Sequence, residues 1–365
     1  MQEIATSLRK YAPLLIVPLA LILNHFPVVP PAWVFLSGLV AIGVLADWVR
    51  RGTEQVASHS GNTIGSLLNV SFGNAAELVL ALFVLSTAQP QVVQAQITGS
   101  IIGTTLLFLG IAALVGGLHH ERQVFRQEHV GLLSTLLLLL AVAIVLPAVF
   151  HATERQMTPG ANFSRLDESL SLGVSVVLLL LYGAHLVYVL VSHRSMFESG
   201  RESDEDGTPE WSLPAGLAVM IVGTIGIAFE AELVSGRLTQ TSSQLGLSPV
   251  FMGVVVLALI GTVSDLFVAV SFARANKMDI VLGLCLGSAI QIALVVAPVL
   301  VITSWVMGHP MNLVFGSPLD LFAIVSAAFI VRFIVADGET TWYEGFLLIG
   351  VYVLFALAYF FLGRV

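Results

Sequence analysis

One stretch of the chain places hard oxygen ligands within a hydrophobic run. Ser71-Phe72-Gly73-Asn74-Ala75-Ala76-Glu77 lies in a segment, residues 64–85, that is otherwise apolar and long enough to cross a bilayer. A carboxylate in hydrocarbon costs about 2.5–3.5 kcal/mol on insertion scales unless it faces protein or water. On a helix, Asn74 and Glu77 share one face because they are three residues apart. Gly73 lets the helix break or another backbone approach, and carbonyl oxygens freed by a break would complete a site for a cation such as Ca²⁺.

The composition predicts a membrane protein around this stretch. Charged residues make up 10% of the chain, and the mean hydropathy is +0.94, so an integral membrane protein is expected, with membrane lipid as its surroundings. A net charge of −8 argues against a nucleic-acid partner. The single cysteine, Cys285, cannot form an internal disulfide. The first apolar run, residues 11–26, lacks a small-residue cleavage site and is interpreted as a membrane helix rather than a signal peptide.

Hydropathy predicts an all-α fold with eleven transmembrane helices. They lie near residues 12–29, 32–49, 62–86, 93–117, 130–150, 169–191, 213–236, 249–272, 279–306, 318–335 and 344–362. Of the 15 Lys and Arg residues, the side opposite the N-terminus holds only Arg155, Arg165, Arg237 and Arg364. The positive-inside rule therefore predicts a cytoplasmic N-terminus in a plasma (inner) membrane, and the odd helix count places the C-terminus outside.

The chain also contains an internal repeat. A shift of 188 residues without a gap superposes Gly73 on Gly261, Glu77 on Asp265, and Gly99-Ser100 on Gly287-Ser288. After an N-terminal helix (1–31), an acidic cytoplasmic linker (193–212) separates two five-helix units, 32–192 and 213–365. Because five is odd, the two units must enter the membrane from opposite sides. We therefore expect one N-terminal helix plus two inverted five-helix repeats, the arrangement of alternating-access transporters with a midplane binding site.

The repeat predicts where the ligands converge. Glu77 and Asp265 should face each other near the pseudo-two-fold axis, where two carboxylates cannot both stay ionised unless a cation neutralises them. The same oxygens would then hold either a divalent cation or protons, which is a physical cause for antiport. The expected supporting polar or helix-breaking positions are Gly73, Asn74, Ser100, Thr104, Gly261, Thr262, Ser264, Ser288 and Gln291. Asp47 and Glu232, at the exit ends of the first helix of each unit, are predicted as acids at which ions enter on opposite sides.

Each of these assignments has a structural alternative. Glu77 could be hydrogen-bonded to neighbouring helices without another role. The serines and threonines could bond to their own helix backbone. Asp47 and Glu232 could be ordinary interfacial acids, and the acidic linker could be a solvated connector rather than a surface that gathers divalent cations.

With these residues in view, the chain resembles the calcium/cation exchangers of the proton-coupled calcium antiporter type. The resemblance rests on three stretches, Leu67-Leu68-Asn69-Val70-Ser71-Phe72-Gly73-Asn74-Ala75-Ala76-Glu77-Leu78, Thr98-Gly99-Ser100-Ile101-Ile102-Gly103 and Gly287-Ser288-Ala289-Ile290-Gln291-Ile292-Ala293-Leu294. It covers nearly the whole chain after the first helix. It implies exchange of cytoplasmic Ca²⁺ for protons, no cofactor, no enzymatic activity, and Glu77 and Asp265 as the central metal ligands.

The second repeat motif departs from the family pattern. Where the family shows Gly-Asn-Ala-Ala-Glu, this chain has Gly261-Thr262-Val263-Ser264-Asp265, and Thr104 stands where the family often has Asn. The hydroxyl-rich motif faintly resembles the sodium/calcium branch, so a sodium-coupled exchanger of the same fold is one alternative. A passive cation channel is another. An intramembrane di-aspartyl protease is disfavoured, because one acid is Glu and no Gly-x-Gly-Asp occurs. A homo-oligomer is left open by the sequence.

Overall fold

The computed structural model describes residues 12–26, 28–158, 162–189, 211–315 and 317–362, with the backbone alone for 60–67 and 69–71. Most of the acidic linker predicted at 193–212 therefore lies outside the described residues. The described part is helical apart from turns and one short antiparallel pair, β1 (Gln123–Val124) with β2 (Glu339–Thr340). Eight of its helices are long and apolar enough to cross a membrane. The all-α membrane fold expected from hydropathy is confirmed.

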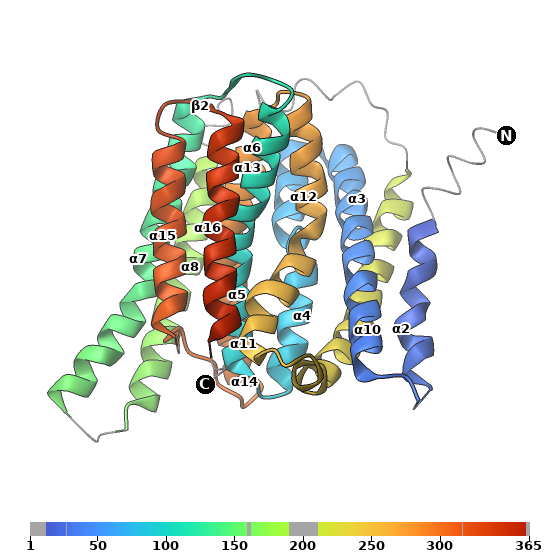
Figure 1. Cartoon of the computed structure of the whole chain (residues 1–365), viewed down its shortest axis with the longest axis vertical. Coiled ribbons are helices and arrows are strands. Elements are labelled where there is room, and N and C mark those ends of the chain that lie inside the picture. Colours follow the sequence, from blue (N-terminus) through green and yellow to red (C-terminus); the bar gives the residue numbers. More distant parts are fainter. Residues whose placement is uncertain (1–11, 27, 159–161, 190–210, 316, 363–365) are drawn as a thin grey trace.

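The first half of the chain contains five spans after a short N-terminal helix. The N-terminal helix consists of η1 (Ala12–Ile16) and α2 (Val17–Asn24). The spans are built from α3 (Pro31–Phe72), α4 (Ala75–Ser86), α5 (Pro90–Ile102), the π-helical η2 (Gly103–Phe108), α6 (Leu109–Gly117), α7 (Gln127–Met157) and α8 (Ser164–Val187). Figure 1 shows α2, α3 and α10 forming one side of the molecule, while α7, α8, α15 and α16 lie on the other.

The second half repeats this plan. Its elements are α10 (Leu213–Leu245), α11 (Pro249–Phe251), the π-helical η4 (Met252–Leu257), α12 (Ala258–Arg274), α13 (Met278–Gln291), the π-helical η5 (Ile292–Val296), α14 (Ala297–Val306), α15 (Pro318–Ile334) and α16 (Trp342–Phe361). Each of the eleven predicted helices thus has a helical counterpart in the described residues.

Several predicted boundaries differ from the structure; among them, α7 runs to Met157 rather than 150 and α8 begins at Ser164 rather than at 169. The first helix ends at Asn24 rather than at 29, and α10 continues to Leu245, nine residues beyond 236. The loop expected between residues 49 and 62 is helical, because α3 is continuous from Pro31 to Phe72. The low hydropathy of this segment predicted a loop. In the structure Arg50 pairs with Glu54 one turn later, and such i,i+4 ion pairs stabilise a helix.

The helix α3 must bend within its second half. Glu54 and Gly73 line the same cavity of about 200 Å³. A straight helix rises 1.5 Å per residue, so it would separate these two residues by about 28 Å, far more than such a cavity spans. Sharp kinks occur at Gly/Ser pairs, and Ser60-Gly61 and Gly65-Ser66 lie in this segment. The bend brings the end of α3 back over its own middle and delivers the motif around Gly73 to the centre of the molecule.

The shift of 188 residues is confirmed by backbone geometry. Ala88 and Asn276 are the two non-glycine residues with positive φ in the described part, and both have φ 57°. The N-caps that follow them, Gln89 and Lys277, also match, with φ/ψ of −114°/60° and −104°/58°. The π-helical segments η2 and η5 lie at equivalent positions as well. The two halves therefore share detailed local structure, including unusual conformations.

Figure 1 shows that the equivalent spans run in opposite directions. The span that begins with α5 ends with α6 at the upper end of the molecule, whereas the span that begins with α13 at the upper end finishes with α14 at the lower end. Between these spans the packing is close: every residue of α5 from Val92 to Ile102 is buried. The inverted arrangement predicted from the odd number of helices in each half is therefore present in the structure.

Candidate cation-binding site

Glu77 lies in the first turn of α4, immediately after an interruption of the helix. The helix α3 ends at Phe72 and α4 begins at Ala75, with Asn74 in a non-helical conformation, φ −107° and ψ 21°. The break therefore falls at Gly73-Asn74, where the sequence indicated one. The Glu77 side chain is only 2% exposed, and the hydroxyl of Ser100 on α5 is the one side-chain hydrogen-bonding group that acts on it among the described residues, at less than ideal geometry. A buried acid in a membrane helix marks a site of function.

The helix α12 passes directly over this acid. A Cβ atom added at Gly261 would lie 2.5 Å from the Glu77 Cγ, so only glycine allows this approach. Gly261 was predicted among the helix-breaking positions, and that part is wrong, because α12 is continuous through it. Asp265 is one turn later on the same face of α12 and interacts electrostatically with Glu77, beside Ser100 of α5. The close crossing is what brings the two acids of the repeat together.

Asp265 lines a cavity of about 200 Å³ that collects polar groups from both halves. Asn74 Nδ2 donates a hydrogen bond to Gln291 Oε1 at 2.8 Å, and the Ser288 hydroxyl donates to Asn74 Oδ1 at 3.4 Å. A space of this size holds a cation with several waters. Carboxylate, amide and hydroxyl oxygens in variable number are the ligands that Ca²⁺ prefers.

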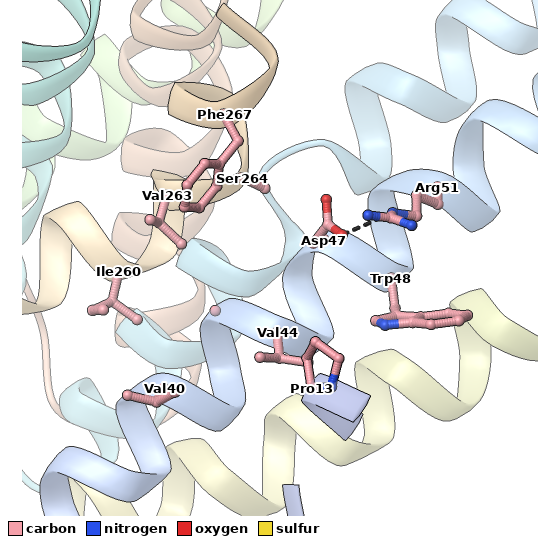
Figure 2. Close-up of a pocket in the computed structure, with 11 residues that line it drawn as sticks. Pro13, Val40, Val44, Asp47, Trp48, Arg51, Ile260, Val263, Ser264 and Phe267 are labelled. Carbon is pink, nitrogen blue, oxygen red and sulfur yellow. Dashed lines mark ion pairs between the residues drawn. The ribbon is translucent and has the colours of Figure 1, made fainter. Parts of the chain in front are cut away.

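Other hydroxyls of the predicted set point elsewhere. Thr104 donates to the Ser100 carbonyl at 2.8 Å and Thr262 donates to the Ala258 carbonyl at 2.9 Å, so both hydroxyl protons are used within their own helices. Ser264 lines a different space, a groove of about 370 Å³ between α3 and α12. Figure 2 shows Ser264, Val263 and Phe267 reaching this groove from α12, opposite Asp47 of α3. These three hydroxyls are not gathered at the cavity.

Asp47 and Glu232, the predicted ion-entry acids, have different surroundings, and their role stays a prediction. Asp47 is ion-paired with Arg50 at 2.9 Å and with Arg51 at 2.8 Å, and the second pair is visible in Figure 2. Glu232 is exposed on α10. The acid that α10 buries is Glu230, which is fully enclosed and has no hydrogen-bond partner for either oxygen among the described residues.

Glu230 was not among the predicted site residues, although the spacing of apolar residues in α10 indicates that it is buried. Its position continues a spacing of three and four along the buried face of α10, formed by Gly223, Ile227, Val234 and Leu238. The helical phase therefore separates Glu230, which faces protein, from Glu232, which does not. Hydropathy alone does not distinguish the two acids, because both lie near the end of the same predicted membrane helix.

Two charged residues at the cavity were also missed. Arg50 and Glu54 of α3 line it together with Asp265. Arg50 was counted only as a cytoplasmic loop charge, because the segment after residue 49 was expected to leave the membrane. The i,i+4 spacing of Arg50 and Glu54 was the available signal that the helix continues.

Within the described ranges, no group of three or more His, Cys, Asp or Glu side chains has the arrangement of a metal site. A cation held here would therefore rely on Asp265 and Glu77 together with neutral oxygens. For Ca²⁺, which accepts amide, hydroxyl, carbonyl and water oxygens, this donor set is suitable.

The two halves differ in how tightly they close around the site. A Cβ added at Gly99 of α5 would lie 1.9 Å from the Val254 carbonyl oxygen of η4. At the repeat-equivalent Gly287 of α13, an added Cβ would meet no atom within 4 Å among the described residues. Gly287 instead lines the cavity. The same helix–helix contact is closed in one half of the molecule and open in the other.

Comparisons with known proteins agree with this architecture. The sodium/calcium exchanger protein family matches residues 30–191 and 215–361. The chain is 38% identical to a Ca²⁺/H⁺ antiporter of Aphanothece halophytica, over 95% of each chain, and 38% identical to the Ca²⁺/H⁺ antiporter ChaA of Bacillus subtilis, over 95% of this chain and 97% of that one. The solved structure of native YfkE matches with a TM-score of 0.79 and 34% identity, covering 95% of this chain and 97% of that one.

Proposed function

The chain belongs to the sodium/calcium exchanger protein family, and on this premise we propose that it is a secondary antiporter that exchanges cytoplasmic Ca²⁺, or a similar divalent cation, for protons. One observation carries the assignment of the site. Glu77 is buried beside the Ser100 hydroxyl and next to Asp265 from the other half. Two carboxylates so placed need either a cation or protons to be neutralised.

This requirement couples the two ions. A divalent cation bound between Glu77 and Asp265 neutralises both charges and excludes protons from the same oxygens. When the cation leaves, protons replace it, because bare carboxylates in a low-dielectric interior are unfavourable. The protein therefore changes between its inward-facing and outward-facing states only with the cation or with protons bound. In this way the energy of the proton gradient is used to move Ca²⁺.

The cavity reaches the site from one side. Its lining includes Glu54, whose side chain is 55% exposed, and Phe272 and Ile280, which flank the α12–α13 turn at the upper end in Figure 1. On the lower side, Leu80, Val84 and Leu85 of α4 are fully buried below Glu77. We infer that the upper end faces the cytoplasm, because the positively charged loop residues are expected there. The protein then lies in the plasma membrane, open toward the cytoplasm.

The alternatives receive less support. Sodium coupling was suggested by the hydroxyl-rich second motif, but the Thr262 hydroxyl donates within its own helix and Ser264 lines the lateral groove. A passive channel needs a path to both sides, whereas the described cavity opens on one. The exchange of Ca²⁺ for protons agrees best with the paired acids.

The test is transport in proteoliposomes that contain the purified protein. Uptake of radioactive Ca²⁺ is measured with an imposed pH gradient, with an imposed sodium gradient, and with neither. We expect rapid uptake only when the lumen is more acidic than the bath. Protons leave the lumen as Ca²⁺ enters, so the lumen should become more alkaline during uptake. Uptake driven by sodium but not by pH would replace the proposal by sodium exchange. Equal flux in all three conditions would indicate a channel.

A further inference from the structure

Arg50 places a fixed positive charge in the cavity that receives the cation. Its side chain is 16% exposed and lines the cavity together with Asp265, with which it interacts electrostatically. It is held by two acids of its own helix, Asp47 at 2.9 Å and Glu54 one turn later. Its Nε is buried and has no hydrogen-bond partner among the described residues.

A guanidinium group in this position opposes the binding of a metal ion. Arginine stays protonated in proteins, so its charge cannot be removed by a change of protonation. A cation that approaches Asp265 is therefore repelled by Arg50 and attracted by the same carboxylates that attract Arg50. Arg50 and the transported ion compete for one negative field.

The position of Glu54 relieves this competition. Glu54 and Asp47 lie on the same face of α3 as Arg50, four residues after it and three before it. Glu54 is half-exposed at the open side of the cavity, so a guanidinium paired with it is drawn away from the interior. Without Glu54, Arg50 keeps its ion pair with Asp47, and Asp265 is the acid that remains on the wall of the cavity.

We propose that Arg50 is a tethered cation that competes with the transported ion for Asp265, and that Glu54 holds it at the rim of the cavity while the ion is bound. This inference rests on the proposed function. It also assigns Arg50 a role in ion selection. When a monovalent ion takes the place of the guanidinium beside Asp265, the positive charge near that carboxylate is unchanged. When a divalent ion takes its place, the positive charge near the carboxylate increases by one. Arg50 therefore disfavours Na⁺ more than Ca²⁺ at the same carboxylates.

The neighbouring arginine provides a matched control. Arg51 also pairs with Asp47, but its side chain lines the lateral groove and not the cavity (Figure 2). We expect Arg50→Gln to lower the Ca²⁺ concentration for half-maximal exchange roughly tenfold, because one nearby repulsive charge is lost. The same variant should make exchange sensitive to inhibition by Na⁺. Arg51→Gln, which changes a residue outside the cavity, should stay within about twofold of the wild type. Arg50→Lys keeps the charge and should lower the half-saturating Ca²⁺ concentration less than Arg50→Gln does.

A double-mutant cycle separates the two parts of the proposal. Glu54→Gln should raise the half-saturating Ca²⁺ concentration in the wild-type background, because Arg50 is released toward Asp265. In the Arg50→Gln background the same change should have no effect. If Glu54→Gln weakens Ca²⁺ binding equally in both backgrounds, Glu54 is a direct ligand and its role as a holder of Arg50 is refuted. If Arg50→Gln behaves like Arg51→Gln, the competition itself is refuted.

Direct binding distinguishes this inference from the proposed function. Each variant in detergent is titrated with CaCl₂, and the shift of its unfolding temperature reports binding without transport. If wild-type vesicles show no proton-driven Ca²⁺ uptake while Arg50→Gln still binds Ca²⁺ more tightly, the proposed function fails and the competition stands. If the wild type exchanges normally and Arg50→Gln alters neither binding nor inhibition by Na⁺, the inference alone is overturned.

Discussion

Gly287 is the position at which the transport cycle can be tested by adding one methyl group. In this structure an alanine Cβ at Gly287 would meet no atom of the described residues within 4 Å, whereas the same change at Gly99, its counterpart in the first half, would place Cβ 1.9 Å from a backbone carbonyl of η4. If the two halves exchange conformations during transport, Gly287 must in turn approach the backbone of α3 as closely as Gly99 now approaches η4. Gly287→Ala should therefore be tolerated in the present state and excluded in the opposite one.

The size of the effect follows from known costs. Replacing glycine by alanine within a helix stabilises it by roughly 0.5–1 kcal/mol. Inserting a methyl group into a closed interface costs roughly 1–3 kcal/mol. The helix-propensity gain applies to α13 in both folded states, so it raises only the stability against unfolding. The interface cost falls on the opposite state alone, so the present state should be favoured by about 1–3 kcal/mol more than in the wild type, which lowers the population of the opposite state roughly five- to a hundred-and-fifty-fold. Gly99→Ala should instead destabilise the described state by at least about 1–3 kcal/mol.

The assay compares unfolding temperature in detergent, equilibrium Ca²⁺ binding and proton-driven Ca²⁺ uptake. For Gly287→Ala we expect an unchanged or higher unfolding temperature, retained Ca²⁺ binding, and exchange at about a fifth of the wild-type rate or less, consistent with a shift of about 1 kcal/mol or more. For Gly99→Ala we expect a lower unfolding temperature. Exchange at the wild-type rate by Gly287→Ala would show that α13 never closes as α5 does, and the symmetric account of transport would be wrong.

Four further substitutions, at three residues, address the ligands. Glu77→Gln keeps the shape of the side chain but loses its charge and its proton, so exchange should fall roughly a hundredfold or more without a loss of folding; a rate within a factor of about two of the wild type would contradict a central role. Asp265→Asn should abolish exchange for the same reason, whereas Asp265→Glu should keep activity with altered affinity, both measured as initial Ca²⁺ flux at matched protein levels. Asn74→Ala removes the amide that joins Gln291 and Ser288, and a roughly tenfold weaker apparent Ca²⁺ affinity is expected from two lost hydrogen bonds; unchanged affinity would show that this link is structural.

The centre of the site was predictable because its signal is local. An acid, an amide and a glycine within an apolar run stand out against their surroundings, and the gapless repeat identifies their partner Asp265. The same repeat predicted the inverted arrangement, since it fixes an odd number of helices in each half. These inferences need only composition and spacing, which the chain carries directly.

The direction of individual side chains was not predictable in this way. Ser264 precedes Asp265 by one residue, which on a helix turns it about 100° away and toward the lateral groove. Glu230 and Glu232 are likewise distinguished only by helical phase. The continuation and bend of α3 depend on tertiary packing, which hydropathy does not report. The polar residues from Arg50 onward were therefore predicted to form a loop. As a result, the two charged residues on the cavity wall were assigned to the membrane surface.

A symmetric sequence pattern also gives no indication that the structure is asymmetric. Glu77 and Asp265 are equivalent by the repeat, yet Glu77 is sealed beneath Gly261 while Asp265 faces an open cavity. The residue equivalent to Gly261 is Gly73, which in this structure is exposed and lines that cavity. In the opposite state, the repeat requires Gly73 to cover Asp265 as Gly261 now covers Glu77. The two glycines would then act as alternate covers over the two acids, and Asp265 is the acid that meets an ion arriving through the open cavity.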